Sequence, residues 1–147
     1  MLLLERKINS EGKVLPGDIL NVGSFLNQML DVQLLREMGN EFHRLFSDCA
    51  VNKILTIESS GISIACMTAL CFGCRVAVAK KGNAKNVSGD VYTAKEYSYT
   101  RDCMCDVTVP KQYLNKNDKI LIIDDFLAKG SALDAMISIA NQAGAQI

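Results

Sequence analysis

Apolar and polar residues follow one another along this chain in blocks that predict alternating strands and helices. Four consecutive apolar residues, Ile120 to Ile123, are bounded by charged residues on both sides, which indicates a strand buried on both faces of a sheet. The other core elements predicted in this way are two buried strands, 53–57 and 75–79, and three helices, 31–48, 62–72 and 131–143. Strands that alternate with helices along the chain predict an α/β fold.

Two parts of the chain have a weaker pattern. Residues 2–11 predict a short helix, whereas residues 18–30 are apolar and irregular and are interrupted by Gly23. Residues 91–100 and 103–109 predict two strands of a hairpin, with partial alternation of apolar and polar positions. A polar hairpin inserted in an α/β core is unusual for stability, so it is a candidate lid over a binding site. A plain edge hairpin is the alternative.

The composition narrows the class of protein. A chain of 147 residues is long enough for one domain with a core of its own. Its 16 basic and 16 acidic residues balance, so no bulk electrostatic attraction to nucleic acid or to a membrane surface is expected. No apolar run is long enough to span a bilayer, and the N-terminus lacks the order of a signal peptide, so we expect a cytoplasmic protein.

Six cysteines and one histidine are further candidates for metal or nucleophilic chemistry. Cys71 and Cys74 have metal-like spacing, and residues 103–105 could complete a set of four ligands. However, Cys66 and Cys71 lie in an apolar helical pattern, where free cysteine packs as a small hydrophobe. We therefore expect reduced core cysteines rather than a zinc site. The lone His43 disfavours a histidine-dependent triad.

The clearest candidate for chemistry follows the strand 120–123. Asp124 and Asp125 come directly after it, then a short turn with Gly130, and then the helix that begins near Ser131. Ligands of open α/β sheets bind at the carboxyl ends of strands, and a helix N-terminus offers free N–H groups and partial positive charge to a phosphate. Because the acidic pair can accept hydrogen bonds from hydroxyls, the stretch predicts a site for a sugar phosphate.

A second loop of small residues follows the predicted strand 53–57. Residues 58–61 (Glu-Ser-Ser-Gly) lead into the helix 62–72 and would form a second anion site at the same edge of the sheet. A sugar that carries both a pyrophosphate and a 5′-phosphate needs two such sites. An ordinary strand-to-helix connection with a serine cap is the alternative for this loop taken by itself.

The first of these stretches resembles the phosphoribosyl pyrophosphate (PRPP) signature of type I phosphoribosyltransferases: four apolar residues, two acidic residues and a small-residue loop. Residues 122–128 (IIDDFLA) resemble its xanthine branch, which often has Ala at the first loop position, here Ala128. Residues 21–27 (NVGSFLN), 56–62 (TIESSGI) and 97–100 (YSYT) match the family at corresponding spacing. The resemblance implies the type I fold, a mainly parallel sheet flanked by helices with a lid hairpin and an N-terminal hood.

The resemblance also implies roles for individual residues. Asp124 and Asp125 would be the catalytic pair that holds the 2′- and 3′-hydroxyls of the ribose. The loop that binds the 5′-phosphate of PRPP would comprise Ala128, Lys129, Gly130, Ser131 and Ala132. The pyrophosphate would be bound by Ser59, Ser60, Gly61, Lys80 and Lys81. Some relatives have Arg where Ser60 stands, and a solvated basic pair is the alternative for the two lysines.

The family's hood and lid would complete the site. Leu20 and Asn27, in a hood of residues 1–30, match purine contacts. The core would be residues 31–147, with a flexible lid at about 82–109. The lid residues implied by the match are Tyr97, Ser98, Tyr99, Thr100 and Arg101. Relatives continue past Ile147 with further strands, so residues 1–147 are expected to form one C-terminally incomplete domain.

The implied reaction is purine salvage, in which the 5-phosphoribosyl group of PRPP moves to N9 of xanthine and pyrophosphate is released. Mg²⁺ would be bound mainly through PRPP, and no dedicated metal site made of protein ligands is expected. The implied partners are PRPP, a 6-oxopurine and a second copy of the chain in a homodimer. The alternatives are a non-catalytic module that binds PRPP or nucleotide, an inactive truncated paralogue, or hypoxanthine, guanine or adenine as the substrate.

Overall fold

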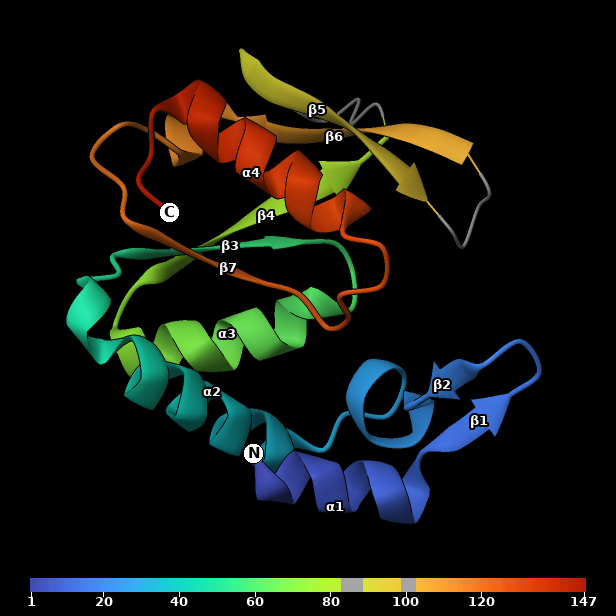
Figure 1. Ribbon diagram of the computed structural model, residues 1–147. Helices are drawn as coiled ribbons and strands as arrows, with labels where there is room; N and C mark the ends of the chain where they lie inside the picture. The colour runs from blue at the N-terminus through green and yellow to red at the C-terminus, as the bar shows by residue number, and fades with distance from the viewer. Residues whose placement is uncertain (83–88, 99–102) are drawn as a thin grey trace.

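The computed structural model describes residues 1–82, 89–98 and 103–147. The helices of its α/β fold are α1 (Leu2–Glu11), α2 (Val32–Phe46), α3 (Gly61–Phe72) and α4 (Ser131–Ala143), with short helical segments at Gly23–Asn27, Ser47–Cys49 and Lys111–Tyr113 (Figure 1). The strands are β1 (Lys13–Leu15), β2 (Ile19–Asn21), β3 (Lys53–Ile57), β4 (Arg75–Lys81), β5 (Val91–Ser98), β6 (Cys103–Pro110) and β7 (Ile120–Ile123).

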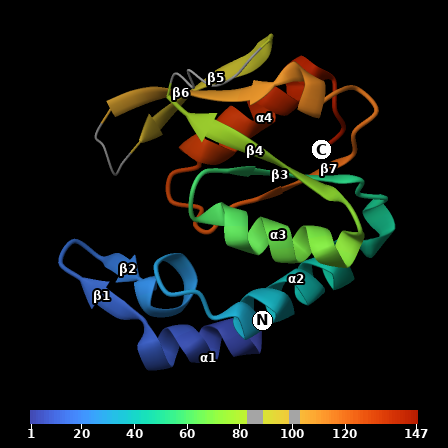
Figure 2. The same cartoon turned by 180° about the vertical axis from the view of Figure 1, so that it is seen from behind.

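Five of the strands form one sheet in the order β5-β6-β4-β3-β7. The strands β4, β3 and β7 are parallel to one another, whereas β6 runs antiparallel to β4 and β5 antiparallel to β6. The helices α2 and α3 cover one face of the sheet and α4 covers the other (Figures 1 and 2). The expected α/β fold is therefore confirmed, with the hairpin as an antiparallel extension of its parallel part.

The central strand β3 shows why these residues form a buried strand. The described residues form two core clusters. Ile54 packs in the cluster beneath α2 and α3, whereas Leu55 and Ile57 pack in the cluster beneath α4. All three side chains are at most 3% exposed. A strand with apolar residues on both faces needs helices on both faces, so the apolar run of β3 requires the three-layer arrangement that the fold provides.

The predicted elements of the core recur with small shifts in their ends. The strands 53–57 and 120–123 have the predicted bounds, and Asp31 caps α2 through a 3.1 Å hydrogen bond that its carboxylate accepts from Leu34 N–H. The strand β4 is longer than predicted, because Lys80 and Lys81 pair with residues of β6. These lysines therefore lie inside the strand, whereas the prediction placed them just after its end.

The N-terminal hood contains more regular structure than its sequence indicated. Residues 18–30 were predicted to be irregular, yet β1 and β2 form a short hairpin and Gly23–Asn27 forms a π-helical turn. Phe25 and Leu26 on this turn are 1% and 4% exposed and belong to the core cluster beneath α2 and α3. The hood is therefore anchored to the core through its apolar turn.

The base of the β5–β6 hairpin is also part of the core. Val107 and Val109 of β6 are at most 1% exposed and pack in the cluster under α4. This burial comes from pairing with β4 on one side and from packing against α4 on the other. The lid expected at about 82–109 therefore includes core residues at its base, and only the outer part of the hairpin remains a candidate lid.

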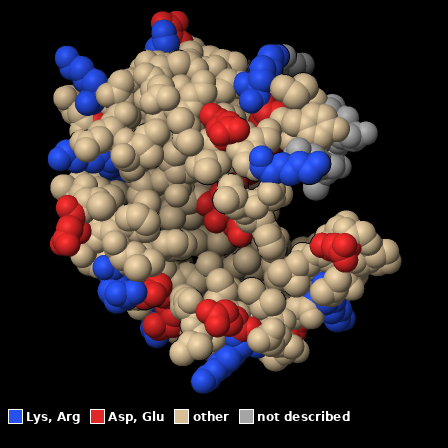
Figure 3. Space-filling view, in the orientation of Figure 1, with Lys and Arg blue, Asp and Glu red and all other residues tan. Residues whose placement is uncertain are grey.

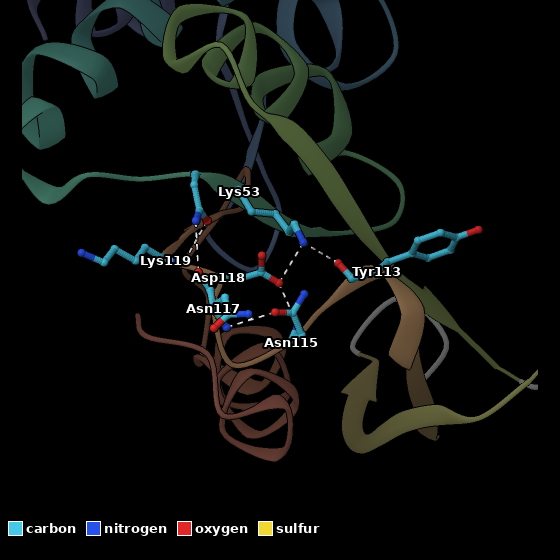
Figure 4. Close-up of polar contacts among 7 residues, drawn as sticks. Lys53, Tyr113, Asn115, Asn117, Asp118 and Lys119 are labelled. Atoms are coloured by element: carbon cyan, nitrogen blue, oxygen red, sulfur yellow. Dashed lines mark hydrogen bonds and ion pairs between the residues drawn. The ribbon is translucent and has the colours of Figure 1, made fainter.

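A network of polar contacts holds together the amino ends of β3 and β7, as Figure 4 shows. Lys53 Nζ donates to Tyr113 O and to Asp118 Oδ2, both at 2.8 Å, and Asp118 Oδ2 also accepts from Asn115 N–H at 2.7 Å. Asp118 is only 7% exposed. A buried carboxylate of this kind needs the charge and hydrogen bonds of its partners, and here Lys53 Nζ and the N–H of Asn115 supply them.

The structure also bears on the expectations for cysteines and membranes. Cys66 is exposed on α3 rather than buried, and Cys71 donates a 3.3 Å hydrogen bond to Asn40 from a half-buried position. Across residues 1–82, 89–98 and 103–147, no group of three or more potential ligands is placed to hold a metal ion. Among the same residues, no helix combines the length and the apolar character that crossing a bilayer requires.

Candidate active site

A cavity of about 390 Å³ lies at the carboxyl ends of β3 and β7. Its wall combines the residues after both strands with the first turn of α4 and the end of β5. Figure 3 shows a deep notch in the molecular surface, between the part that carries the β5–β6 hairpin and the hood, with acidic side chains at its inner wall. A cavity therefore lies at the edge of the sheet where the sequence predicts the binding site.

The acidic pair lines this cavity. Asp124 and Asp125 both contribute to its wall, and Asp124 Oδ1 accepts a 2.9 Å hydrogen bond from the N–H of Asp125. Burial raises the pKa of Asp124 to about 6, and the Asp125 carboxyl adds to the rise, whereas the Asp125 N–H and the charge of Lys81 oppose it. A carboxyl group with this pKa can take up or release a proton near neutral pH.

The predicted phosphate loop closes the same cavity. Its predicted members Ala128, Lys129, Gly130, Ser131 and Ala132 all line the wall. Gly130 has a φ of +81°, a left-handed conformation that glycine adopts without strain, and α4 starts directly after it. The first turn of a helix leaves backbone N–H groups without intrahelical partners. The acidic pair and a helix N-terminus therefore face one cavity.

The Ser131 side chain does not cap α4. The N-cap position is Gly130, and no side chain caps the helix. The Ser131 hydroxyl instead accepts a 2.8 Å hydrogen bond from the backbone N–H of Tyr97 on β5. The physical reason is its location, since α4 packs beside β5 and the first residue of the helix meets the end of the strand.

The loop after β3 approaches the acidic pair very closely. A Cβ atom on Gly61 would lie 2.5 Å from Thr56 Oγ1 and 3.1 Å from Asp124 Oδ1, so only glycine fits there. Ser60 lines the cavity, whereas Ser59 is exposed and does not. The Thr56 hydroxyl is buried and has no hydrogen-bond partner within the described chain. The two predicted anion loops therefore meet at Gly61 and Asp124.

Gly61→Ala is expected to destabilise the protein by about 1–3 kcal/mol, because the methyl group overpacks a site bounded by Thr56 and by the backbone of Asp124. Since Asp124 must shift to make room, turnover should also fall. Thermal unfolding and an assay of pyrophosphate release measure the two effects. Cys49→Ala, at an exposed position outside α3, is the control and should leave both unchanged. Wild-type behaviour of Gly61→Ala would contradict the prediction.

The two predicted lysines are already paired within the protein. Lys81 lines the cavity, and its Nζ lies 2.9 Å from Glu96 Oε1, while its backbone N–H donates to Glu58 Oε1 at 2.7 Å. Lys80 Nζ lies 2.9 Å from Glu58 Oε2 and is not part of the cavity wall. A pyrophosphate would therefore compete with two glutamates for these charges.

Glu58 and Glu96 are two acidic residues of the cavity wall to which the sequence analysis assigned no role of their own. Both line the cavity, and Glu96 is only 5% exposed. Glu58 directly follows the predicted strand 53–57, so its position at the sheet edge was available from the sequence. Glu96 was not recognisable, because its burial depends on the distant Lys81, with which it pairs across the sheet.

Some predicted residues are not brought to this cavity. Leu20 is half-buried against the core beneath α2 and α3, and Asn27 is exposed at the end of the π-helical turn, so neither contributes to the wall. Of the predicted lid residues, Tyr97 lines the cavity and Ser98 ends β5. The other three, Tyr99, Thr100 and Arg101, lie outside the described residues.

Comparison with known proteins places this chain in a family. The chain is 51% identical over 148 residues to xanthine phosphoribosyltransferase 2 of Clostridium botulinum (strain Hall), with 100% of this chain and 78% of the relative covered. It is 49% identical over 146 residues to the xanthine phosphoribosyltransferase of Clostridium tetani, with 99% and 77% covered. The corresponding protein of Lactobacillus delbrueckii subsp. bulgaricus is 46% identical over 147 residues, with 100% and 78% covered. No family model matches.

Solved structures with the same fold are adenine phosphoribosyltransferases. The enzyme from Giardia lamblia, complexed with 9-deazaadenine, superposes with a TM-score of 0.78 at 24% identity, over 94% of this chain and 76% of that chain. The enzyme from Saccharomyces cerevisiae superposes with a TM-score of 0.77 at 20% identity, over 100% and 85%. At these identities the likeness establishes the fold, which is that of the type I phosphoribosyltransferases. Sequence identity over the full length of this chain then gives the narrower assignment: the chain belongs to the xanthine phosphoribosyltransferase family.

Proposed function

We propose that this protein transfers the 5-phosphoribosyl group of PRPP to N9 of xanthine and releases pyrophosphate, a purine salvage reaction. The observation that carries the proposal is one cavity that joins Asp124 and Asp125 to the N-terminus of α4. Carboxylates suit the ribose hydroxyls, and the helix N-terminus suits the 5′-phosphate. The curated relatives named xanthine phosphoribosyltransferase support the choice of base.

In this mechanism, catalysis is mainly electrostatic and positional. As the bond between C1 of the ribose and the pyrophosphate breaks, positive charge grows on the ribose ring, and the purine N9 forms the new bond to C1. Asp124 and Asp125 would hold the 2′- and 3′-hydroxyls and stabilise that charge, while the amides of residues 128–132 hold the phosphate in place. Preorganised groups of this kind require no rearrangement when the charge develops.

Asp124 is also a candidate for the general base. Because its pKa is about 6, it is ionised at neutral pH and still basic enough to accept a proton from the purine. We therefore assign removal of the purine proton to Asp124 and hydrogen bonding to the ribose to the pair.

Mg²⁺ fits the donor set of the cavity. Glu58, Glu96, Asp124 and Asp125 all line it, and carboxylate oxygens are ligands that this ion favours. Oxygens of PRPP and water would supply most of the ligands of the ion, and Asp125 would contribute to holding it. When bound, the ion neutralises part of the negative charge on the departing pyrophosphate.

The proposal includes a cytoplasmic homodimer. The helix α3 carries apolar residues on nearly every side, and Leu70 on it is 74% exposed. A helix that is apolar all round is normally covered by other protein. A second copy of the chain packed on α3 would cover Leu70 and the neighbouring Cys66, which is also exposed.

The test is pyrophosphate release from PRPP and Mg²⁺ with xanthine, hypoxanthine, guanine and adenine in turn. We expect the largest kcat/KM with xanthine. A preference for another base would overturn the substrate assignment and leave the reaction class intact. Binding of PRPP without turnover of any base would instead identify a non-catalytic module or an inactive paralogue. Asp48→Asn, at an exposed position far from the acidic pair, serves as the matched control for substitutions of Asp124 and Asp125.

A further inference from the structure

The outer edge of the strand β5 is covered by a helix rather than by another strand. β5 is the last strand on its side of the sheet, and α4 packs against it (Figures 1 and 2). An edge strand exposes backbone N–H and C=O groups that need other partners. Here the side chains of α4 supply them.

Two side chains on α4 bond to the backbone of β5. Gln142, near the end of the helix, donates from Nε2 to Thr93 O at 2.9 Å and accepts from Thr93 N–H at 3.3 Å. Ser131, the first residue of the helix, accepts from Tyr97 N–H at 2.8 Å. The two anchors are about 16 Å apart along the helix at ~1.5 Å per residue and about 14 Å apart along the strand at ~3.4 Å per residue. The helix and strand are therefore matched in length between their anchors.

The two anchors differ in what lies beside them. Gln142 is exposed and far from the cavity, whereas Ser131 and Tyr97 both line the cavity wall. A serine hydroxyl can accept hydrogen bonds and also donate one. Among the described residues, the Ser131 hydroxyl accepts from Tyr97 and donates to no acceptor. Its proton is therefore available to a ligand in the phosphate loop.

We infer that Ser131 is a positioning residue that couples phosphate binding in the loop of residues 128–132 to the position of Tyr97 on β5. This inference rests on the proposed function, which places a phosphate in that loop. A phosphate oxygen accepts the Ser131 O–H, and the same hydroxyl oxygen accepts the Tyr97 N–H, so the three groups form one chain of hydrogen bonds. Bonds in such a chain strengthen one another by polarisation.

The sign of the coupling can be stated in advance: each event is expected to favour the other. Because linkage between two binding events is reciprocal, a phosphate in the loop tightens the bond to Tyr97, and a well-placed Tyr97 tightens phosphate binding. The two hydrogen bonds between Gln142 and Thr93 lie far from the phosphate loop, so they should not respond to phosphate binding. The end of β5 nearest the cavity is thus held more firmly when the phosphate loop is filled.

The experiment measures backbone amide exchange at Tyr97 and Thr93 by NMR, with and without ribose 5-phosphate, whose binding is followed separately by calorimetry. In the wild type, saturating ribose 5-phosphate should slow exchange at Tyr97 at least about fivefold, the lower end of typical coupling between linked sites. Exchange at Thr93 should not change. Ser131→Ala should abolish the response at Tyr97 even at saturating ligand, and Ser131→Thr should restore it.

Gln142→Ala is the matched control, because it removes the other anchor of the same helix and strand. It should speed exchange at Thr93 and leave the response of Tyr97 to ribose 5-phosphate intact. If ribose 5-phosphate binds to the wild type and Tyr97 exchange is unchanged, or if Ser131→Ala responds as the wild type does, the coupling is wrong and the proposed function stands. If ribose 5-phosphate does not bind at all, the phosphate-loop assignment fails and the coupling fails with it.

Discussion

Asp124→Asn is expected to lower kcat by about 10²- to 10³-fold, the range seen when a group that stabilises transition-state charge or moves a proton is lost. The asparagine keeps the size of the side chain and an oxygen that can accept the Asp125 N–H bond seen at 2.9 Å. It lacks the negative charge and the basicity. Asp125→Asn should also lower turnover, because the second carboxylate faces the same cavity. Pyrophosphate release with PRPP and xanthine measures both variants.

The same Asp124→Asn substitution should make the protein more stable at neutral pH. The pKa of Asp124 is raised from an ordinary value of 3.8 to about 6, so the folded state disfavours the ionised carboxylate. The resulting loss of stability develops as the pH rises from about 4 to about 6 and is complete above 6. Because the side chain is partly exposed, we expect a gain of only about 1 kcal/mol for the variant at pH 7.

Urea unfolding at pH 7 and at pH 4 separates this effect from an unspecific one. The gain from Asp124→Asn should be present at pH 7 and absent at pH 4, where the wild-type carboxyl is protonated in the folded state. Asp48→Asn, an exposed control, should not show this dependence. Retention of full activity by both Asp124→Asn and Asp125→Asn would remove the acidic pair from the mechanism.

Asp118→Ala is expected to destabilise the protein by about 3 kcal/mol, because it leaves the largely buried Lys53 ammonium without its charge partner. The Lys53 side chain is 17% exposed and loses its 2.8 Å contact with the carboxylate, and the N–H of Asn115 loses its acceptor. Turnover per folded molecule should be preserved, since these groups lie at the amino ends of β3 and β7, opposite the cavity (Figure 4). Urea unfolding and an assay below the unfolding temperature measure the two properties.

Asp90→Ala is the matched control for this prediction. Asp90 pairs with Lys111 at 3.4 Å, but its side chain is 85% exposed, so its loss should change stability by less than about 0.5 kcal/mol. The double variant Lys53→Met with Asp118→Leu should recover much of the stability, because apolar residues can replace a buried ion pair. Equal effects of Asp118→Ala and Asp90→Ala would show that burial is not what makes the first pair important.

Apolar runs were sufficient to predict two parallel strands of the sheet, and the residues after them predicted the location of the candidate site. Residues 54–57 are buried, and residues 120–123 include a buried residue at each end of the run, so both segments leave an apolar signal in the sequence that does not depend on distant contacts. The acidic pair and the phosphate loop follow directly from the end of β7, so their shared cavity could be expected from chain order alone. The hood was harder, because all but one of the six residues in β1 and β2 are exposed and show no alternation.

Contacts between distant parts of the chain could not be predicted in the same way. The pairing of Lys81 with Glu96, and that of Lys53 with Asp118, join residues whose proximity exists only after the sheet has formed. The sequence predicted that Lys80 and Lys81 would neutralise a pyrophosphate, but it did not indicate the glutamates with which they pair. Likewise, Val107 and Val109 suggested one face of a strand, and only the packing of α4 shows that this face is core.

The contacts at the amino ends of β3 and β7 have a consequence for the chemistry at the other ends. Asn52 bonds to Lys119 in both directions, through Asn52 N–H to Lys119 O at 2.9 Å and Lys119 N–H to Asn52 Oδ1 at 2.8 Å, beside the ion pair of Lys53. These bonds set the register of β7 against β3. Because side chains alternate between the faces of a strand, a slip by one residue would turn the side chains of β7 to the opposite faces and displace Asp124 and Asp125, which directly follow it. A polar network at one end of the strand thereby helps to hold the acidic pair in place at the other end.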